Sequence, residues 1–476
     1  QRIFLEICWE ALEQAGHLPK HFKGSIGVYA GCEINTYYEN NVYLNNELQD
    51  QVGGLNIYTV NGKDFIAPRV AYHLNLKGPA VSVHSACSTS LLAITEAATA
   101  IRTGQCDVAL AGGSSVTAPI YSGHPYDEGF IKSPNGSTRP FDASGKGTVF
   151  SDGAGVVLLK SLEAAKRDGD TIYGIIKGVG VNNDGGDKGS FMAPNSKGQA
   201  GAITKALNDA QVLPSTISYL EAHGTATLVG DPIEVEGLKI AYGKQERNGY
   251  CALGSIKSNF GHTTAAAGVA GLIKTILAMR NKQIPPLVGF TKPNPNIDFE
   301  NSPFYLTNKV LDWVVDGPRR AGISSFGIGS TNVHVIVEEY EMEPKPTTVG
   351  RPSQILTWSA KSENSLSGYQ STLGNFIQKS PNTSLADIAY SLSATRDEFS
   401  HRTFSIADTS KEAAENLTSL KPINTKSSIL KVEPTEMGFL FPGQGSQYLQ
   451  MGKTLYDNEK VYSNAIDECA ELLKIK

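Results

Sequence analysis

The hydrophobic positions of this chain fall into short runs that alternate with longer stretches of helical spacing. Short runs rich in β-branched residues predict buried strands at residues 25–30, 80–83, 108–111, 156–159, 172–181 and 333–338. Apolar residues at helical spacing predict helices at residues 3–15, 91–102, 198–210, 233–241 and 268–280. Strands that alternate with helices in this way predict an α/β domain built of layers.

Two of the predicted strands begin in a similar way. Residues 152–160 and 327–337 each consist of a glycine-rich turn that leads into an apolar run. Such a repeat suggests a fold made of two similar halves. The pattern changes after Glu339, where a stretch rich in Pro, Lys, Thr and Gly predicts a linker.

Length, composition and charge set bounds on what the protein can be. A chain of 476 residues exceeds one ordinary domain, so we expect two or three units. With 40% hydrophobic and 19% charged residues, the chain has the composition of a soluble globular protein with a large core. The net charge of -5 gives no reason to expect nucleic acid or an anionic membrane as a partner. No apolar run has the length of a membrane span.

The cysteines are scattered and show no CxxC spacing. This distribution predicts reduced thiols in a cytoplasmic protein, with neither a disulfide framework nor a zinc site. We therefore expect no bound metal. The six positions are Cys8, Cys32, Cys87, Cys106, Cys251 and Cys469.

Cys87 lies where a predicted strand leads into a predicted helix. Small residues surround it, in the order His84-Ser-Ala-Cys87-Ser-Thr-Ser90. The free N–H groups and the positive dipole at a helix start favour a thiolate, which is the nucleophilic form of cysteine. An inert buried thiol is the alternative, and it is the commoner fate of a free cysteine.

Two later segments favour the catalytic alternative. His223 and His262 each stand beside a glycine at the end of an apolar run, which predicts loops at a sheet edge. A lone histidine in such a loop is more often structural than catalytic. Together with Cys87, the two make a Cys-His-His set that suits acyl-thioester chemistry, with a thiolate to hold the acyl group and imidazoles to bind an oxygen or move protons.

These motifs identify the chain as a member of the β-ketoacyl synthases, of the kind built into modular type I polyketide synthases. The resemblance runs from residue 1 to about 339 and includes Arg139-Pro-Phe-Asp142, Gly153-Ala-Gly155 and Ser324-Ser-Phe-Gly-Ile-Gly329. It implies a thiolase-like fold of two similar halves, layered α-β-α-β-α, followed by a small α+β linker domain.

The resemblance also implies a reaction and partners. The enzyme would be an acyltransferase that forms C–C bonds by decarboxylative condensation of a Cys87-bound acyl chain with a malonyl-type extender. Both substrates would arrive on the phosphopantetheine arm of acyl carrier protein domains, with no cofactor bound directly. An adjacent acyltransferase domain and a second copy of the chain, in a homodimer, are the other expected partners.

By the same resemblance, each site residue receives a role. His223 and His262 would hold the extender's thioester oxygen, and Lys257 would order the histidine loop. The backbone N–H groups of Cys87 and Ile328 would form the oxyanion hole. Three further residues would contact the phosphopantetheine arm or the substrate: Thr225, Thr227 and Phe326.

Four positions depart from the commonest family pattern, although none removes a catalytic group. His84 stands where an acid or amide is usual, and we expect it to face a packed neighbour. Ala226 and Ser330 replace glycines. Thr264 replaces an acid or amide, which removes an expected partner of Lys257.

The family pattern also divides the chain. Residues 1–340 would be the ketosynthase, residues 341–354 a linker, residues 355–432 the ketosynthase–acyltransferase adaptor, and residues 433–476 the start of an acyltransferase. The N-terminal part of the ketosynthase, with a further strand and helices, is expected to precede residue 1. The GxSxG serine turn of the acyltransferase is not part of this sequence.

Several alternatives stay open at this stage. A type I fatty acid synthase shares all these motifs. A transacylase that does not elongate chains would lack the second histidine, and a degradative thiolase would need a second cysteine in the C-terminal glycine-rich loop. A non-catalytic scaffold would have lost Cys87. Acyl chain length, extender unit and final product depend on the shape of the pocket and cannot be read from the motifs.

Overall fold

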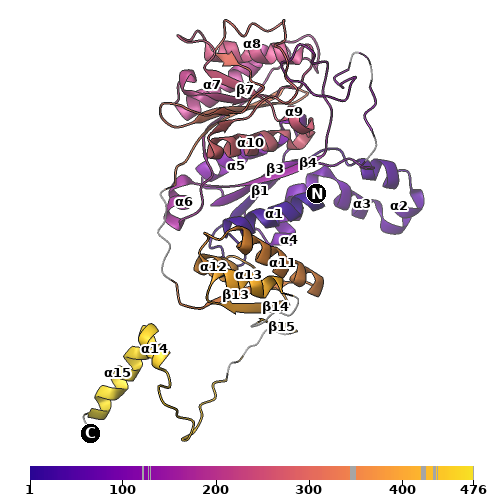
Figure 1. Ribbon diagram of the computed structural model, residues 1–476. Helices are drawn as coiled ribbons and strands as arrows, with labels where there is room; N and C mark the ends of the chain where they lie inside the picture. Colours follow the sequence, from indigo (N-terminus) through magenta and orange to yellow (C-terminus); the bar gives the residue numbers. More distant parts are fainter. Residues whose placement is uncertain are drawn as a thin grey trace.

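The computed structural model describes residues 1–120, 123–126, 128, 130–342, 350–419, 425–431, 436 and 438–474. Half of the expected linker, residues 343–349, lies outside this part of the chain. Figure 1 shows a layered body, a smaller domain beside it, and two C-terminal helices, α14 (Lys453–Asn458) and α15 (Lys460–Lys474).

The first sheet of the body has the strand order β2-β1-β3-β4. Its strands are β1 (Ile26–Cys32), β2 (Ala80–Ser82), β3 (Val108–Ser115) and β4 (Gly153–Lys160). β1 runs parallel to both β2 and β3, whereas β4 is antiparallel to β3.

The second sheet repeats this pattern. In the strand order β5-β12-β11-β6-β7-β9, β6 is parallel to β7 and β11, and β12 is antiparallel to β11. The expectation of two similar halves is therefore confirmed. On its outer edge β12 pairs with β5, whereas β4 has no such partner among the described residues. The strands are β5 (Ile175–Asn183), β6 (Tyr219–Glu221), β7 (Cys251–Gly254), β9 (Phe304–Tyr305), β11 (Arg320–Phe326) and β12 (Thr331–Glu338).

Helices complete five layers. α5 (Thr89–Arg102) and α10 (Ala267–Asn281) share one apolar core with strands of both sheets. α1 (Arg2–Ala15) and α4 (Ile66–Leu74) pack on the first sheet in a second core, and α7 (Ser196–Ala210) and α8 (Gly230–Tyr242) cover the second sheet in a third. Figure 1 shows α5 and α10 between the sheets, which confirms the α-β-α-β-α, thiolase-like layering.

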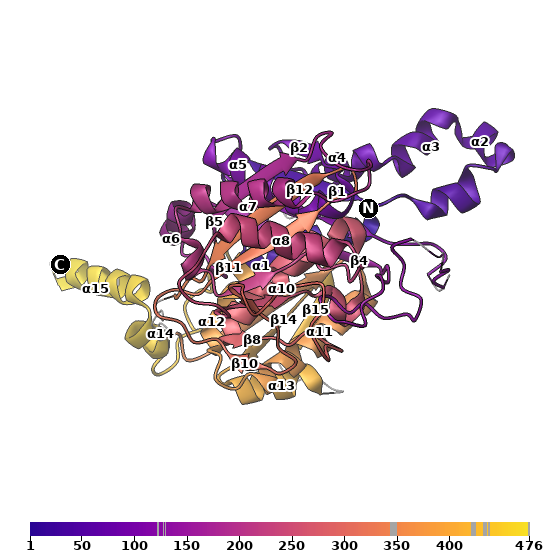
Figure 2. The same cartoon turned by 90° about the horizontal axis from the view of Figure 1, so that it is seen from above.

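Two short helices form an arm that projects from the body in Figures 1 and 2. They are α2 (Asn46–Val52) and α3 (Gly54–Asn61). The arm and its approach expose several large apolar side chains: Tyr37, Tyr43, Leu44, Leu55, Tyr58 and Val60. The remaining elements of the body are α6 (Leu162–Asp168), α9 (Lys257–Phe260), β8 (Gln283–Ile284) and β10 (Leu311–Asp312).

The small domain has its own sheet and its own apolar core. The antiparallel strand order is β13-β14-β15, and the core draws on both strands and helices, which confirms the small α+β domain. Its elements are β13 (Gln354–Ala360), α11 (Glu363–Lys379), α12 (Leu385–Ala394), β14 (His401–Ala407), α13 (Ser410–Thr418) and β15 (Thr425–Ile429).

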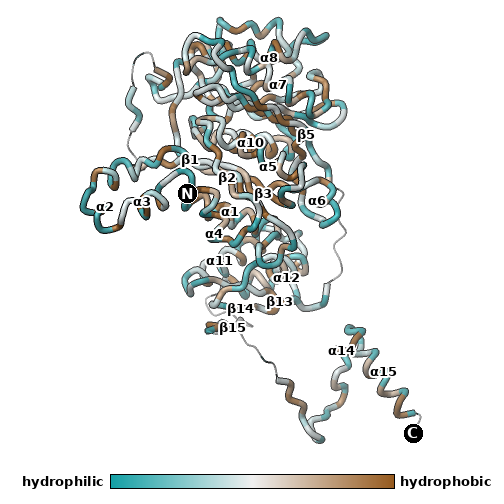
Figure 3. The backbone as a smooth tube through the Cα atoms, turned by 180° about the vertical axis from the view of Figure 1, so that it is seen from behind, coloured by the Kyte–Doolittle hydropathy of each residue, from teal (hydrophilic) through white to brown (hydrophobic). Residues whose placement is uncertain are grey.

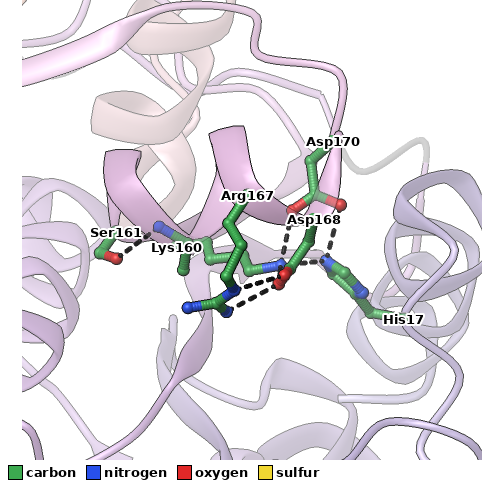
Figure 4. Close-up of polar contacts among 7 residues, drawn as sticks. His17, Lys160, Ser161, Arg167, Asp168 and Asp170 are labelled. Carbon is green, nitrogen blue, oxygen red and sulfur yellow. Dashed lines mark hydrogen bonds and ion pairs between the residues drawn. The ribbon is translucent and has the colours of Figure 1, made fainter.

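An ionic cluster joins the end of β4 to α6 and α1 (Figure 4). The Lys160 ammonium, whose side chain is 5% exposed, lies 2.6 Å from the carboxylates of both Asp168 and Asp170. His17, which follows α1, lies 3.3 Å from Asp170. The polar sequence around His17 predicts a solvated side chain. That prediction is wrong, because this contact holds His17 in a buried position.

The C-terminal segment presents apolar side chains outward. Figure 3 shows a hydrophobic stretch between the small domain and α14, where Leu440 is 99% exposed.

Within the described parts of the chain, no helix combines the length and apolar character needed to span a bilayer. All six cysteines are free thiols.

Candidate active site

Cys87 lies in a 3₁₀ turn (Ala86–Ser88) between β2 and α5. Ala86 has a φ of 54°, in the left-handed region that costs an L-residue about 1 kcal/mol. Two hydrogen bonds stabilise this turn. The Ser85 N–H donates to Thr89 Oγ1 at 2.9 Å, and the Ser325 hydroxyl of β11 donates to the Cys87 carbonyl at 2.8 Å. The second half of the fold thus fixes the backbone of Cys87.

The structure brings Cys87, His223 and His262 together. The Cys87 sulfur and a ring nitrogen of each histidine all lie within 4.8 Å of one another. The imidazole rings meet edge to face, with centroids 5.4 Å apart and planes at 86°. Cys87 comes from the first half, and both histidines come from the second half, where His223 follows β6 and His262 follows α9. The layered fold therefore assembles the set that the sequence predicts.

The hydrogen bonds of His262 determine its tautomer. Its Nδ1 accepts the backbone N–H of Thr264 at 3.1 Å, so in the neutral ring Nε2 carries the hydrogen. That Nε2 is buried and has no hydrogen-bond partner in the described part of the chain. The ring also stacks on Phe150, with centroids 5.5 Å apart. The site thus holds an oriented, unused N–H donor.

His223 is held through its backbone. Its N–H and that of Gly224 donate to the two oxygens of Glu234, at 2.7 and 2.8 Å, and its carbonyl accepts a hydrogen bond from the Lys257 ammonium. The ring lies against Phe326, with centroids 5.8 Å apart. These contacts leave the imidazole facing Cys87 and His262.

Burial lowers the pKa of both His223 and His262 well below the usual value, and the charge of Lys257 lowers both further. Each imidazole is therefore neutral near pH 7. A neutral imidazole whose N–H is free can donate to an oxygen on which negative charge develops. Buried, uncharged donors of this kind match the chemistry expected of the two histidines.

Burial also raises the pKa of Cys87 above its usual value. Lys257 and the backbone N–H groups of Ile328 and Cys87 lower it, by smaller amounts. The N–H groups at the helix start favour the thiolate, in the direction that the sequence predicts, but the cost of burying a charge exceeds this stabilisation. Cys87 rests as a thiol that becomes a thiolate during reaction.

The glycine-rich turn after β11 reaches Cys87 because glycine stands at 327. A Cβ at this position would lie 2.2 Å from the Ser85 carbonyl oxygen, so a side chain would push the turn away. The N–H groups of Ile328 and Cys87 both face the Cys87 sulfur. Two backbone donors therefore converge on the sulfur from the two halves of the fold.

Three buried acidic side chains, which received no role from the sequence motifs, support this site. Glu234 holds His223 and Gly224, and Asp231 accepts the N–H groups of Phe141 at 2.6 Å and Ala226 at 2.9 Å. Burial raises the pKa of Glu234 to about 7 and that of Asp231 to about 8. The third is Glu221. The motif that could have revealed Asp231 and Glu234 is Gly230-Asp-Pro-Ile-Glu234. Its two acids lie one helical turn apart on α8 and face the loop.

Three of the four positions that depart from the family pattern lie where the backbone has a positive φ. Ala226, Thr264 and Ser330 have φ values of 60°, 42° and 76°, in the left-handed region that glycine, asparagine and aspartate adopt most readily. His84 follows the end of β2 at Ser82, and its side chain is exposed but lies against the backbone of Lys63.

Thr225 and Thr227 lie on the loop after His223, where their hydroxyl oxygens are 3.2 Å apart. Both are half-buried, next to exposed Leu228 and Val229.

Among the described residues, Cys87, His223 and His262 form the only cluster with the spacing of metal ligands. The hydrogen on His262 Nε2 opposes a metal there, since a metal needs the nitrogen lone pair.

Family models match most of the chain. The β-ketoacyl synthase N-terminal domain matches residues 1–165, and the β-ketoacyl synthase C-terminal domain matches residues 173–291. The ketoacyl-synthetase C-terminal extension matches residues 293–406. These three regions cover the layered body and much of the small domain.

Similar proteins include large synthases. The chain is 39% identical to a phenolphthiocerol/phthiocerol polyketide synthase of Mycobacterium tuberculosis over 98% of its own length and 33% of that protein. It is 36% identical to polyketide synthase GfsE of Streptomyces halstedii over 99% of its length and 13% of that protein. The chain thus spans a third or less of these relatives.

Solved structures agree. Ketosynthase twelve of the bacillaene polyketide synthase of Bacillus amyloliquefaciens superposes with a TM-score of 0.83 at 36% identity, over 90% of this chain and 75% of that one. A second bacillaene ketosynthase from Bacillus amyloliquefaciens, from module 1, gives 0.80 at 32% identity, over 90% and 76%. The Cys-His-His geometry, the domain matches and these structures agree with one another. The chain therefore belongs to the β-ketoacyl synthase family, the ketosynthases that form C–C bonds by condensation.

Proposed function

We propose that this chain elongates polyketides, by condensing an acyl group on Cys87 with a malonyl-type extender delivered on acyl carrier protein. The observation that carries the proposal is the meeting of the Cys87 sulfur and two neutral imidazoles within 4.8 Å. The pathway is inferred from the named synthases among its relatives, of which this chain covers only a part.

In the first step, the Cys87 sulfur attacks the carbonyl carbon of an acyl thioester. The bond from that carbon to the carrier's sulfur breaks, and the proton of Cys87 leaves with the carrier thiol. The N–H groups of Cys87 and Ile328 would hold the oxyanion, a contribution of about 3 kcal/mol per donor. Burial disfavours negative charge on the Cys87 sulfur. It therefore favours the attack, in which the charge moves to the carbonyl oxygen next to these N–H donors.

In the second step, the extender loses its carboxylate as CO₂, and the bonding electrons pass to an enolate. His223 and His262 would donate N–H groups to the enolate oxygen, while Lys257 keeps the His223 loop in place. The enolate carbon attacks the acyl carbonyl, and the Cys87 sulfur departs and regains a proton. The product is a β-ketoacyl thioester two carbons longer.

The carrier's phosphopantetheine arm would reach the site past Thr225, Thr227 and Phe326. The paired hydroxyl groups of the threonines suit the amides of such an arm. Phe326 is 7% exposed and touches His223, so it would border the thioester end. No cofactor of the chain's own takes part in this scheme.

The division of the chain is part of the proposal. Residues 341–354 would be the linker, and residues 355–432, which have a separate core, the ketosynthase–acyltransferase adaptor. Residues 433–476 would open an acyltransferase domain, which would cover apolar side chains such as Phe439 and Leu440, 75% and 99% exposed. The protein would work in the cytoplasm.

We also propose a homodimer. β2 is an edge strand whose Val81 is 41% exposed, and the arm beside it exposes Tyr43 and Leu44 at 60% and 80%. An edge strand next to exposed apolar groups favours pairing with a second copy. Light scattering would give the mass of two chains, and Val81→Lys would give one.

The test of the function is the intact mass of the protein after incubation with a short acyl thioester. A gain of one acyl group that Cys87→Ala abolishes supports the proposal, and malonyl-carrier protein should then release CO₂ and yield a β-ketoacyl product. Acylation without condensation would point to a transacylase, and no acylation of the folded protein would indicate a scaffold. Comparison of branched with straight acyl groups would separate polyketide from fatty acid substrates.

A further inference from the structure

Glu221 occupies a position that connects all three segments of the histidine side of the site. It ends β6, two residues before His223, and is 2% exposed. Its Oε1 accepts the backbone N–H of Ile256 at 2.5 Å, and Ile256 directly precedes Lys257. Its Oε2 lies 2.6 Å from the ammonium of Lys274 on α10, the helix that follows His262.

The packing around this carboxylate is tight. The Tyr219 hydroxyl donates to Oε2 at 2.8 Å, and the Lys274 ammonium lies 5.5 Å from the centre of the Tyr219 ring. On α10, a Cβ at Gly271 would lie 3.1 Å from Glu221 Cγ, so the helix approaches closely because this residue is glycine. Lys274 is itself 14% exposed, so the pair is shielded from water.

We propose that Glu221 and Lys274 are positioning residues for the decarboxylation and condensation step. The pair fixes α10 and the start of α9 against β6, and so sets how His262 and Lys257 lie relative to His223. Among the described residues, neither side chain has a hydrogen bond or ion pair to the Cys87 turn, which Ser325 and Thr89 hold. The start of α10 does meet a residue just after this turn, since the Val269 N–H donates to Ser90 Oγ at 3.0 Å. The pair lies further along α10, and we therefore expect it to act on the histidine step and to change the acylation of Cys87 little. This inference rests on the proposed function.

The chemistry of the pair explains why it suits this role. A charge-assisted hydrogen bond in a buried place is short and directional, and it resists small shifts of the helix. Removal of one partner leaves the other charge buried and unpaired, which disturbs the local structure more than removal of both. The second partner of Glu221, the Ile256 N–H, needs only an oxygen, which glutamine also supplies.

The experiment compares Glu221→Gln, Lys274→Met, the double variant and Lys274→Arg. We expect Cys87 acylation within threefold of wild type in all four. Release of CO₂ from malonyl-carrier protein should fall at least tenfold in Glu221→Gln and in Lys274→Met, in kcat rather than in KM. The fold-loss of CO₂ release in the double variant should be smaller than the product of the two single fold-losses. Lys274→Arg should keep most of the wild-type rate. The partly exposed ion pair Glu236–Lys239 on α8 supplies the matched control, as Glu236→Gln and Lys239→Met.

Hydrogen exchange gives a second readout that needs no activity. The amides of residues 254–262 should exchange faster in Glu221→Gln and Lys274→Met than in wild type, and those of residues 85–90 should not. The proposal is overturned if exchange is unchanged, if both half-reactions fall equally in folded variants, or if the folded double variant retains the wild-type rate of CO₂ release. A wild type that takes up no acyl group would refute the proposed function, and the exchange data would still test the positioning.

Discussion

Lys257 donates a hydrogen bond to the backbone carbonyl of His223, and so acts on the loop rather than on the imidazole ring. Its side chain is buried, and the carboxylates of Glu234, Glu221 and Asp231 favour its charged form against the cost of burial. The same charge lowers the pKa of His223, His262 and Cys87. One lysine therefore both holds the loop and sets the electrostatics of the site.

Replacement of Lys257 by methionine should impair stability and condensation together. The variant keeps the apolar stem but leaves buried carboxylates without their cation, which costs about 3 kcal/mol in the free energy of unfolding. Condensation should fall about 100-fold, because the His223 loop loses its hydrogen bond. Urea denaturation and product formation measure the two effects. Lys309→Met, at an exposed loop position, should change neither, and a Lys257→Met variant with wild-type turnover would refute this role.

Alanine at His223 or His262 should separate the two half-reactions. Each histidine would supply one N–H to the enolate oxygen, so loss of either should slow CO₂ release about 100-fold, or about 3 kcal/mol. Acylation of Cys87 should remain within a few-fold, because the oxyanion hole that we propose is made by backbone groups. Intact mass follows acylation, and released CO₂ follows the second step. Equal loss of both steps would instead show that the histidine activates the thiol.

The raised pKa of Cys87 predicts how its reactivity changes with pH. Below the pKa of a thiol, the thiolate fraction rises tenfold per pH unit, so alkylation by iodoacetamide should become about tenfold faster per unit from pH 6.5 to 8.5. Peptide mass spectrometry can follow Cys87 separately from Cys469, which is exposed. A rate that levels off below pH 8 would mean that the surrounding N–H groups and Lys257 outweigh burial.

The sequence predicts the layers because their signals are local. Each strand and helix expected in the body is found, from residues 26–32, where the run at 25–30 predicts a strand, to the helix at Ala267–Asn281. The arm of α2 and α3 escapes prediction, since its apolar residues are exposed and follow no buried face. The identity of Cys87, His223 and His262 follows from motifs, whereas their mutual distance depends on how the two sheets pack.

The supporting shell could not be predicted in the same way. Glu221 meets Lys274 across 53 residues, and Ser325 meets the Cys87 carbonyl across 238 residues, so no local pattern predicts either contact. The protonation state of Cys87 depends on the assembled fold for a related reason. A helix start is visible in a sequence, but the burial that raises the pKa of the thiol is a property of the assembled fold.

Ser330 stands where the family usually has glycine, and its hydroxyl group has a hydrogen-bond partner. The last prediction concerns this residue. Ser330 accepts a hydrogen bond from Lys188, which also donates to the Phe191 carbonyl at 2.7 Å. The same loop holds the Gly329 carbonyl through Asn183 at 3.1 Å. Residues 183–191 thus brace the turn that carries the Ile328 N–H.

Ser330→Ala should therefore slow the acylation of Cys87 several-fold, because the oxyanion-hole turn loses one brace, and should leave CO₂ release by the acylated enzyme unchanged. Lys188→Met also removes the hydrogen bond to the Phe191 carbonyl, so it should slow acylation at least as much. The double variant should be no worse than Lys188→Met, since both single changes remove the hydrogen bond between Lys188 and Ser330. Single-turnover acylation, followed by mass, measures this. Lys197→Met on α7, where the lysine's side chain makes no such contact among the described residues, is the control. Additive losses in the double variant would mean that Lys188 and Ser330 act on the turn independently.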